Sequence, residues 1–425
     1  MAKGHIRQQE SQCSANRDEP SFPEYPLSFF ACPIPDCADF NHFAAGNLSV
    51  AERMGKNKAI RRLYCKTCGR RFSEREGSLM RYTKLPEAVV VRMVKCLGHG
   101  CSVEATADIC EVDPRTVERL LEKAGTRAQD FHRLQLERLQ KPPEAVQLDE
   151  LHARVAKSAS DAEKKGAKPR TAGTRSARPK GRVWVHAALD VASRFLIELQ
   201  VGPRTLFMAC QLVASVALCC PTALPLLLID DHLPYPSAIL QVFGVVKHRR
   251  RRRRRGPRCK PALKAPPGLW VGVVKKLRDA RGNLRKVSSY ALFGRLKDIN
   301  RKIMQLRIGR RINTSRLERL NGTLRTQQSR LTRRTRNLSK LPSMLQWCLW
   351  LWRDLYNWTR PHGSLQGHCP AMLMGLTEHV WTVLEYIRYP AHVSELQRQD
   401  WLEQRKDVLE SALEKYQRKK SLPTS

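Results

Sequence analysis

The chain has 425 residues, of which 42% are hydrophobic, so it is long enough to bury the cores of about two to four domains. Its 77 Lys and Arg residues outnumber 39 Asp and Glu residues, which gives a formal net charge of +38. Such an excess repels itself unless a polyanion neutralises it. We therefore expect nucleic acid as the partner, with an anionic membrane surface as the weaker alternative.

The cysteines and the start of the chain argue against a secreted protein built on disulfides. Fourteen cysteines are scattered along the sequence, and residues 1–20 are polar, without an apolar signal segment. The most apolar window, 206–229, is interrupted by Gln211 and by two prolines, so we expect a buried helix and strand there. These features predict reduced thiols, a cytoplasmic location associated with the nucleoid, and no membrane contact.

A polar segment over 1–27, which we expect to be mobile, leads into a cysteine module over 28–80. Two close cysteine pairs, spaced C-x4-C and C-x2-C with 27 residues between the pairs, consist of Cys32, Cys37, Cys65 and Cys68. Such pairs are typical of a tetrahedral Zn²⁺ site that folds a segment too short for its own core, so we predict a zinc ribbon with structural Zn²⁺. His42 could replace one ligand, and four buried cysteines that never meet are the alternative.

Three helical stretches follow over 86–125. The third begins with Asp113 as a cap and Pro114 in the first turn, and we expect it to stop at Gly125. A short helix, a tight turn and a capped helix form the pattern of a helix-turn-helix DNA-binding domain, although a plain three-helix bundle is the alternative. The residues expected on the outward face of the third helix, within reach of DNA, are Arg115, Thr116 and Arg119.

A run of β-prone segments begins at about residue 145. The segments expected to be strands are 145–149, 182–190, 195–201, 224–230 and 245–246, with helices at 203–219 and 237–243 between them. A strand meander, a strand-helix-strand unit and a late helix carrying an acid are the order of an RNase H-like domain. The sequence therefore predicts a multidomain α/β protein in which 145–365 forms an RNase H-like mixed sheet flanked by helices.

Two basic segments, 157–181 and 249–267, interrupt this domain and are expected to be loops; the second contains seven consecutive arginines at 249–255. The aromatic-rich segment 341–358 has the pattern of an amphipathic helix, and core packing is its expected role. The remaining residues, 366–425, are expected to form a helical tail that is exposed towards its end.

Three acidic residues far apart in the sequence have settings that suit metal ligands. Asp149 ends one expected strand, Asp230 ends another, and Glu318 lies on the late helix. Two strand ends and a helix can bring carboxylates together, and Mg²⁺ prefers a few carboxylate oxygens together with water and phosphate. We therefore predict a site for Mg²⁺ or Mn²⁺ made by these three residues.

These residues occur in segments that resemble the DDE transposases of bacterial insertion sequences. The resemblance covers about 28–390, and the segments that carry it are Asp149-Glu150, Asp230 with Tyr235-Pro236, Asn313 to Arg325 around Glu318, and Tyr356 to His362 with Arg360-Pro361-His362. The members of that family that it is most similar to place a zinc ribbon and a helix-turn-helix ahead of an RNase H-like catalytic domain. One departure is that 87 residues separate Asp230 from Glu318, which suggests an insertion.

The resemblance implies that Asp149, Asp230 and Glu318 are the catalytic, metal-binding triad. Asp231 is adjacent to Asp230 and is the alternative second ligand, whereas Asp190 falls in the family's second strand, which supplies no ligand. Asn321 and Arg325 follow Glu318 by three and seven residues, so one helix face would hold the metal carboxylate and DNA-binding groups.

The activity that this resemblance implies is cleavage and joining of DNA strands at the terminal inverted repeats of an insertion sequence, by a homo-oligomer assembled on element ends and target DNA. Two alternatives remain open. A DNA-binding regulator or domesticated transposase would lack catalysis, and an RNase H-like nuclease would cut without joining.

Overall fold

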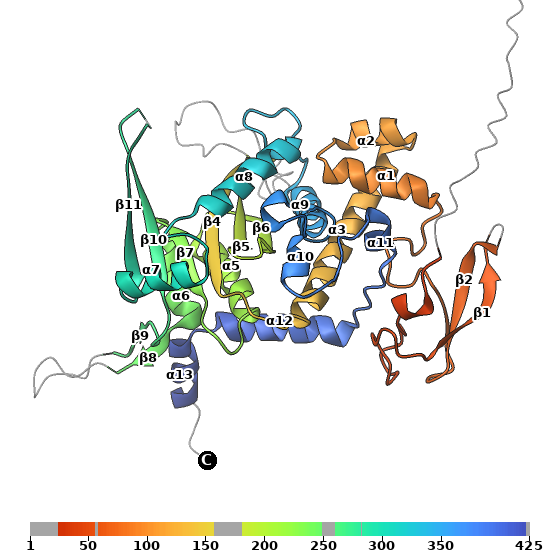
Figure 1. The fold of residues 1–425 in the computed structure, drawn as a ribbon, viewed down its shortest axis with the longest axis horizontal. Coiled ribbons are helices and arrows are strands. Elements are labelled where there is room, and N and C mark those ends of the chain that lie inside the picture. Colours follow the sequence, from red (N-terminus) through yellow and green to blue (C-terminus); the bar gives the residue numbers. More distant parts are fainter. Residues whose placement is uncertain (1–23, 56–57, 157–180, 249–259, 282, 422–425) are drawn as a thin grey trace, which may run out of the picture.

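The computed structural model describes residues 24–55, 58–156, 181–248, 260–281 and 283–421 (Figure 1). The predicted basic loop 157–181 lies almost entirely, and the arginine run entirely, outside these residues. The predicted loop 249–267 is described from residue 260, where it is partly wrong because residues 262–264 form a strand. The fold is mixed α/β, with a small cysteine-rich sheet, a helical unit and a six-stranded sheet flanked by helices. None of the helices in the described ranges combines the length and apolar character needed to cross a membrane.

The cysteine-rich module is a three-stranded antiparallel sheet in the order β1-β2-β3, with a short 3-10 helix before it. Its elements are η1 (Leu27–Phe29), β1 (Leu48–Met54), β2 (Ile60–Cys65) and β3 (Arg71–Ser73). Its small core consists of Phe30, Leu48 and Leu63 around the cysteines. The segment 1–27 was expected to be mobile, but Tyr25 within it has a fixed contact. Arg61 Nη2 donates to the Tyr25 carbonyl at 2.8 Å.

The helical unit contains the predicted turn between two helices. Its helices are α1 (Glu87–Gly98), α2 (Val103–Cys110) and α3 (Pro114–Glu137). Ser102 Oγ caps α2 by accepting from the N–H of Ala105 at 2.9 Å, and Glu111 ends it in the left-handed region at φ 54°. These local contacts set the sharp turn into α3.

The predicted end of the third helix at Gly125 is wrong, because α3 continues to Glu137. Gly125 lies where α3 crosses another helix, and a Cβ there would come within 2.4 Å of the Trp347 Cβ. Gly125 therefore permits close packing of two helices and does not stop either of them. The buried second half of α3, which includes Phe131, belongs to the core of the large domain.

The central sheet has the strand order β11-β10-β7-β4-β5-β6. Strands β4, β7 and β10 are parallel, and β5, β6 and β11 pair antiparallel with their neighbours. Its strands are β4 (Ala145–Arg154), β5 (Arg182–Asp190), β6 (Leu196–Gly202), β7 (Leu226–Asp230), β10 (Val271–Arg278) and β11 (Leu284–Phe293). The predicted meander is therefore confirmed as β4, β5 and β6, and the run ending at Asp230 is an inner strand, as its continuous apolar character requires.

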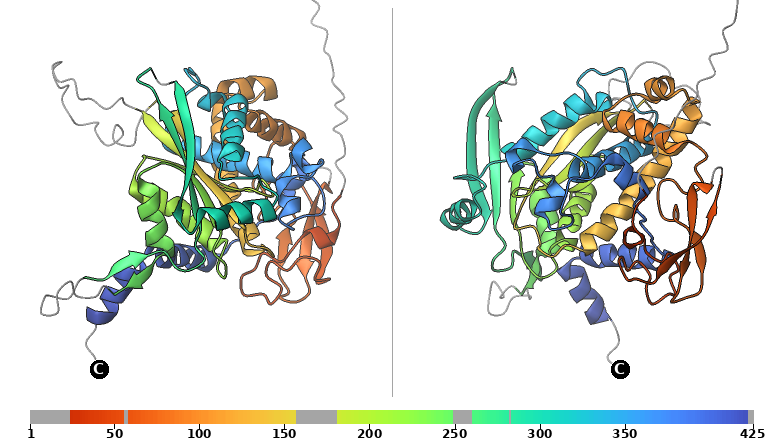
Figure 2. Two further views of the ribbon diagram at one scale, coloured as in Figure 1. Left: turned by 60° about the vertical axis from the view of Figure 1, so that its left-hand side comes forward. Right: turned by 45° about the vertical axis from the view of Figure 1, so that its right-hand side comes forward.

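The predicted strand at 245–246 exists, but its place in the central sheet was wrongly expected. It is β8 (Val245–Lys247), which pairs with β9 (Ala262–Lys264) in a separate two-stranded sheet. The strand beside β7 is β10 instead. Together β10 and β11 form a long hairpin that extends beyond the sheet (Figures 1 and 2).

Helices cover both faces of the central sheet. The remaining elements are α5 (Leu206–Leu218), α6 (Pro234–Phe243), α7 (Leu296–Gln305), α8 (Ser315–Gln327), η3 (Ser329–Leu331), α9 (Pro342–Trp358), η4 (Gly363–Leu365), α10 (Pro370–Leu373), α11 (Val383–Arg388), α12 (Glu395–Leu409) and α13 (Ala412–Ser421). Helices α5 and α6 pack with β-strand residues such as Leu148 and Ile229, whereas α8 and α9 pack with residues such as Val185 and Leu199 from the other face. The aromatic helix α9 is buried along most of its length, which confirms its predicted role in the core.

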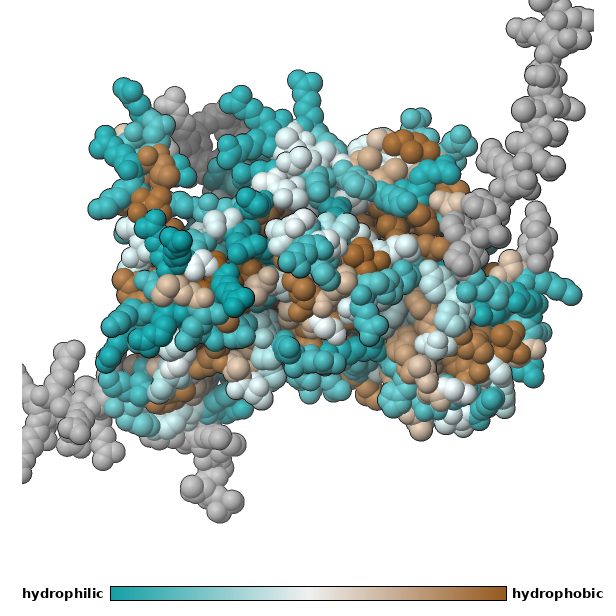
Figure 3. Space-filling model, viewed as in Figure 1, coloured by the Kyte–Doolittle hydropathy of each residue, from teal (hydrophilic) through white to brown (hydrophobic). Residues whose placement is uncertain are grey.

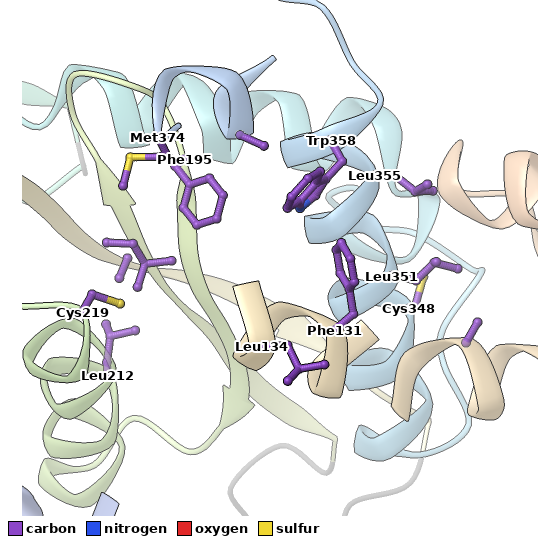
Figure 4. Close-up of a cluster of buried hydrophobic side chains, with 14 of the residues drawn as sticks. Phe131, Leu134, Phe195, Leu212, Cys219, Cys348, Leu351, Leu355, Trp358 and Met374 are labelled. Carbon is purple, nitrogen blue, oxygen red and sulfur yellow. The ribbon is translucent and has the colours of Figure 1, made fainter. Parts of the chain in front are cut away.

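The core joins the helical unit to the domain that contains the central sheet. Phe131 of α3 meets Trp358 of α9 edge to face at 5.1 Å between ring centroids, and Phe195 and Leu212 extend the cluster towards α5 (Figure 4). The face seen in Figure 3 is mainly hydrophilic, with apolar patches that include one on the β10–β11 hairpin, where Leu284 and Val287 are about half exposed. The shared core means that α3 and the sheet are held as one packed body.

Candidate functional site

Two of the three predicted acids meet at one edge of the sheet. Asp149 follows Leu148 in the middle of β4, so the predicted strand end at residue 149 is wrong, because β4 continues to Arg154. Asp230 ends β7, the parallel neighbour in which Ile229 is paired with Leu148. Parallel neighbours in this register bring equivalent positions side by side, so both carboxylates project at the same place. Asp149, Asp230 and Glu150 each offer an oxygen, and these oxygens all lie within 4.8 Å of one another.

The environment of these carboxylates disfavours their charges. Burial, and next the nearby charge of Asp230, raise the pKa of Asp149 to about 6. Burial likewise raises the pKa of Glu150 to about 7. The Oδ1 atom of Asp230 and the Oε1 atom of Glu150 are buried and accept no hydrogen bond from a described residue. Oxygen ligands that crowd together with unused lone pairs fit a divalent cation, which would offset their repulsion.

Glu150 is the member of this group that the sequence did not identify as a ligand. Successive residues in a strand point to opposite faces, so strand alternation alone would place only one of Asp149 and Glu150 at the site. The Glu150 side chain is fully buried, and Arg204 Nη2 lies 3.2 Å from its Oε2 atom. The available signal was the pair of adjacent acids, Asp149 and Glu150, inside an otherwise mostly apolar strand.

Glu318 lies on α8 next to this group but outside the set of mutually close oxygens. Its Oε1 atom accepts from Thr314 Oγ1 at 2.7 Å and lies 2.5 Å from the Lys276 Nζ atom. After burial and Asp230, its charge is among those that raise the pKa of Asp149. The role of Glu318 as third ligand therefore stays a prediction, and in this structure an ammonium group holds its carboxylate.

The two aspartates that competed with these residues have other partners. Asp231 accepts from the Tyr290 hydroxyl at 2.9 Å and lies 3.2 Å from Lys275 Nζ, so it faces the β10–β11 hairpin. Asp190 is buried and accepts from the N–H and the Oγ–H of Ser193, which closes the turn after β5. The geometry therefore favours Asp230 over Asp231 and gives Asp190 a structural bond.

Asn321 and Arg325 share the α8 face with Glu318, as predicted. The side-chain amide of Asn321 donates to Asp149 Oδ2 at 2.8 Å, and the backbone N–H of Glu150 donates to Asp149 Oδ1 at 2.8 Å. Both oxygens of Asp149 are thus oriented by the protein. Arg325 is partly buried, and burial lowers its pKa while the nearby Asp149 carboxylate raises it. DNA contacts by either residue stay predictions.

The predicted DNA-reading residues lie at the start of α3. Arg115 and Arg119 are exposed and Thr116 is half-buried, whereas Val117 between them is buried in the helical unit. Asp113 Oδ1 accepts from the N–H of Arg115 at 2.7 Å and fixes this end of the helix. The arrangement leaves their side chains accessible at the surface.

The four predicted zinc ligands converge in the cysteine-rich module. The Sγ atoms of Cys32 and Cys68 are 3.7 Å apart, and those of Cys37 and Cys65 are 3.8 Å apart. A tetrahedron with Zn–S bonds of about 2.3 Å has edges of about 3.8 Å, so these two separations match a tetrahedral Zn²⁺ site. The alternative of cysteines that never meet is therefore wrong, and His42 lies outside the cluster with a side chain that is 67% exposed.

Backbone groups in the second cysteine pair prepare one thiol for a metal. Burial alone would raise the pKa of Cys65, but N–H groups of Cys68 and Thr67 direct their hydrogens to its sulfur, and its pKa falls to about 7. Gly69 makes this possible because its φ of 70° lets its N–H return to the Cys65 carbonyl at 2.9 Å.

Comparisons with known proteins give no sequence relative. The sequence matches no protein-family model and no curated protein. Among solved structures, the Mos1 strand transfer complex aligns over 37% of this chain and 54% of that chain, at 13% identity and a TM-score of 0.15. A pre-cleavage Mos1 transpososome aligns over 37% of this chain and 57% of that chain, at 11% identity and a TM-score of 0.15.

A piggyBac transposase synaptic complex with hairpin DNA aligns more widely, over 82% of this chain and 75% of that chain, at 9% identity and a TM-score of 0.28. This chain spans about half the length of the Mos1 chains. Scores this low do not establish a shared fold.

Proposed function

We propose that this protein is a DDE-type DNA transposase of an insertion sequence, which binds the terminal inverted repeats of its element and catalyses metal-dependent strand cleavage and strand transfer. The observation that carries the proposal is the group of Asp149, Glu150 and Asp230, whose oxygens lie within 4.8 Å of one another, in a chain with a net charge of +38. Carboxylates crowded in this way within a strongly basic protein suit metal-assisted chemistry on a phosphodiester.

The chain's own groups would hold the reacting atoms in place. Divalent ions bound at Asp149 and Asp230 would supply a lowered pKa for the attacking water and stabilisation of the leaving 3′ oxygen. Asn321 and the N–H of Glu150 fix the orientation of the Asp149 carboxylate. Arg204 holds Glu150, and Glu318 could join the ligands once it leaves Lys276. No covalent bond between protein and DNA is needed, because a freed 3′-OH can attack target DNA directly.

Recognition and chemistry would be divided between two parts of the chain. Arg115, Thr116 and Arg119 are placed to read or contact the inverted repeat, because the first residues of a recognition helix reach base edges and phosphates. A homo-oligomer would bring two element ends together, each with its own carboxylate site.

The proposal can be tested with labelled DNA that spans the borders of the gene's own element, incubated with zinc-loaded protein, Mg²⁺ and a supercoiled target plasmid. We expect wild type to nick at the element end and to join the new 3′-OH to the plasmid. Asp230→Asn should abolish both reactions and leave DNA affinity within about twofold, since affinity comes from many phosphate contacts. Asp231→Asn is the matched control and should keep both activities.

The outcomes separate the competing functions. Absence of nicking by wild type would favour a DNA-binding regulator, and nicking without joining would favour a nuclease. Equal loss of activity in Asp230→Asn and Asp231→Asn would contradict the assigned ligand.

A further inference from the structure

A basic cleft lies on the side of α8 away from the carboxylates. It has a volume of about 550 Å³ and is enclosed by α8, the turn between β5 and β6, the 308–315 segment and the end of α9. Its charged and aromatic lining consists of Arg194, Arg316, Arg319, Arg360, Tyr356 and His362. Among the described residues that line it there is no Asp or Glu. We call this cavity the arginine cleft.

Three of its guanidinium groups have no counter-charge among the residues that the structure describes. The side chains of Arg194, Arg316 and Arg319 make no hydrogen bond or ion pair with any described residue. Arg316 is half-buried, and burial together with the charge of Arg319 lowers its pKa, which means that the protein itself disfavours its charge. A solvated basic surface would spread such groups apart, whereas here they converge on one cavity. An anion would remove the repulsion.

Arg360 differs from these three because it is anchored. Its guanidinium donates to the Gly98 carbonyl at 2.8 Å and to the Gln327 side chain, and it lies 5.3 Å from the Trp352 ring centroid. These bonds tie α1, α8 and α9 together at the back of the cleft. Arg360 therefore has a fixed position in the lining of the arginine cleft, and its positive charge adds to the positive potential inside the cleft.

The floor of the cleft is apolar. Leu189, Leu320 and Tyr356 contribute to it and are all buried, and the Tyr356 ring stacks on Trp352 at 5.1 Å between centroids. A rim of guanidinium groups above an apolar, partly aromatic floor matches a nucleotide, which carries a phosphate at one end and a flat base at the other. A free inorganic anion would leave this floor uncovered.

The size of the cleft decides between duplex and single strand. Its volume lies within the range of about 300–1,000 Å³ that is typical of pockets for small molecules, so it can enclose one nucleotide. A DNA duplex cannot enter a cavity of this size, because its bases face inwards and both backbones would have to fit.

The helical geometry of α8 relates the cleft to the carboxylates. Arg316, Arg319 and Thr323 repeat at spacings of three and four residues and form one row, and Glu318, Asn321 and Arg325 form a second row. At about 100° per residue the two rows lie on opposite flanks of the buried Leu317, Leu320 and Leu324 stripe, roughly one helix diameter of 10 Å apart. A strand leaving the metal-binding carboxylates could pass over α8 into the cleft.

We infer that the arginine cleft binds a single-stranded segment of DNA next to the strand that is cut, with its phosphates at Arg194, Arg316 and Arg319 and one base on the apolar floor. The inference rests on the proposed function and adds the substrate feature that this function would recognise, an unpaired strand flanking the duplex.

The test compares a blunt DNA duplex with the same duplex carrying a single-stranded tail, by fluorescence anisotropy with zinc-loaded full-length protein at several salt concentrations and without Mg²⁺. We expect wild type to bind the tailed duplex several-fold more tightly. Arg316→Gln/Arg319→Gln should remove this preference and lower the salt slope on tailed DNA by about 1.4, from two contacts at about 0.7 each for a single strand. Blunt-duplex affinity should change little.

The matched control is Lys297→Gln/Arg301→Gln, which removes two exposed charges from α7 and should keep the preference for the tail. Arg316→Lys/Arg319→Lys should retain most of it, which separates loss of charge from loss of fold. Equal weakening on blunt and tailed DNA would overturn the inference, and so would unchanged binding. The absence of Mg²⁺ keeps this result independent of whether the protein cleaves DNA.

Discussion

The charge of Lys276 affects all three predicted acids of the carboxylate site. Its ammonium lies 2.5 Å from Glu318 Oε1. Burial raises the pKa of both Asp149 and Asp230, and the Lys276 charge acts against this effect on each of them. One ammonium group thus neutralises part of the repulsion that a divalent ion would otherwise relieve, so the charge of Lys276 opposes binding of the ion at Asp149 and Asp230.

We therefore predict that Lys276→Met binds Mn²⁺ about tenfold more tightly than wild type, because removal of a cation a few ångströms away favours another at the same ligands. Isothermal titration calorimetry of the metal alone would measure this. Lys275→Met is the control, since Lys275 pairs with Asp231 and should leave Mn²⁺ affinity unchanged. Weaker binding by Lys276→Met would show that the lysine supports the site.

The sequence was sufficient to predict which acids follow apolar runs in the inner strands. Asp149 and Asp230 could be identified because an apolar run fixes the strand and the strand fixes the position of the acid, although only Asp230 ends its strand and β4 continues past Asp149 to Arg154. Glu150 could not, since strand alternation places it on the opposite face and only the folded chain shows its side chain returning. The pairing of Glu318 with Lys276 joins residues 42 positions apart and depends on how α8 packs beside β10.

At the scale of elements, close packing between α3 and α9 explains why α3 contains a glycine and still continues past it. Gly125 lies in the middle of α3 against α9, and the backbone there is helical on both sides. A glycine near a run of apolar residues predicts a helix end equally well, so local sequence could not distinguish a stop from a crossing point.

We predict that Gly125→Ala lowers the free energy of unfolding by about 1–3 kcal/mol, although alanine is the better helix former, because its Cβ would clash with Trp347. Gly322→Ala is the matched control: Gly322 is also inside a helix, but a Cβ there meets nothing within 4 Å, so stability should rise by about 0.5–1 kcal/mol. Denaturant unfolding followed by circular dichroism would measure both. Stabilisation by both substitutions would contradict the crossing described for α3.

The central sheet likewise contains strands that the sequence predicted and one strand that it did not. Its meander and β7 followed from apolar patterning, but β10 was missed because its four buried residues run directly into Lys275 and Lys276 at the exposed end. A short strand that becomes charged halfway along resembles a loop in sequence. The role of β10 is decided by its pairing with β7, a contact that spans the basic insertion.

At the scale of the whole molecule, the cysteine-rich module is attached to the C-terminal part of the chain. The backbone N–H of Leu79 donates to the Ile387 carbonyl at 2.9 Å, Asn41 donates to the His392 carbonyl at 2.6 Å, and Phe43 stacks on Tyr389 at 5.2 Å. The module's own core is small, so its folding depends on the four thiolates and on this contact.

We predict one zinc per chain by elemental analysis. Removal with a chelator should unfold the cysteine module, increase protease cleavage within 28–80 and leave the central sheet folded, because the sheet has a separate core. Cys65→Ser should have the same effect as the chelator, whereas Cys219→Ser, a buried cysteine far from the cluster in sequence, should retain the metal. Zinc content well below one per chain would contradict the assignment.

The continuous helix α3 has a mechanical consequence. Its exposed first turn carries the groups proposed to recognise DNA, and its second half is embedded among the aromatic rings that support the sheet. Because this helix is continuous, it holds its first turn at a fixed distance from the carboxylate site. The protein would therefore fix the number of base pairs between the bound sequence and the phosphate that reacts.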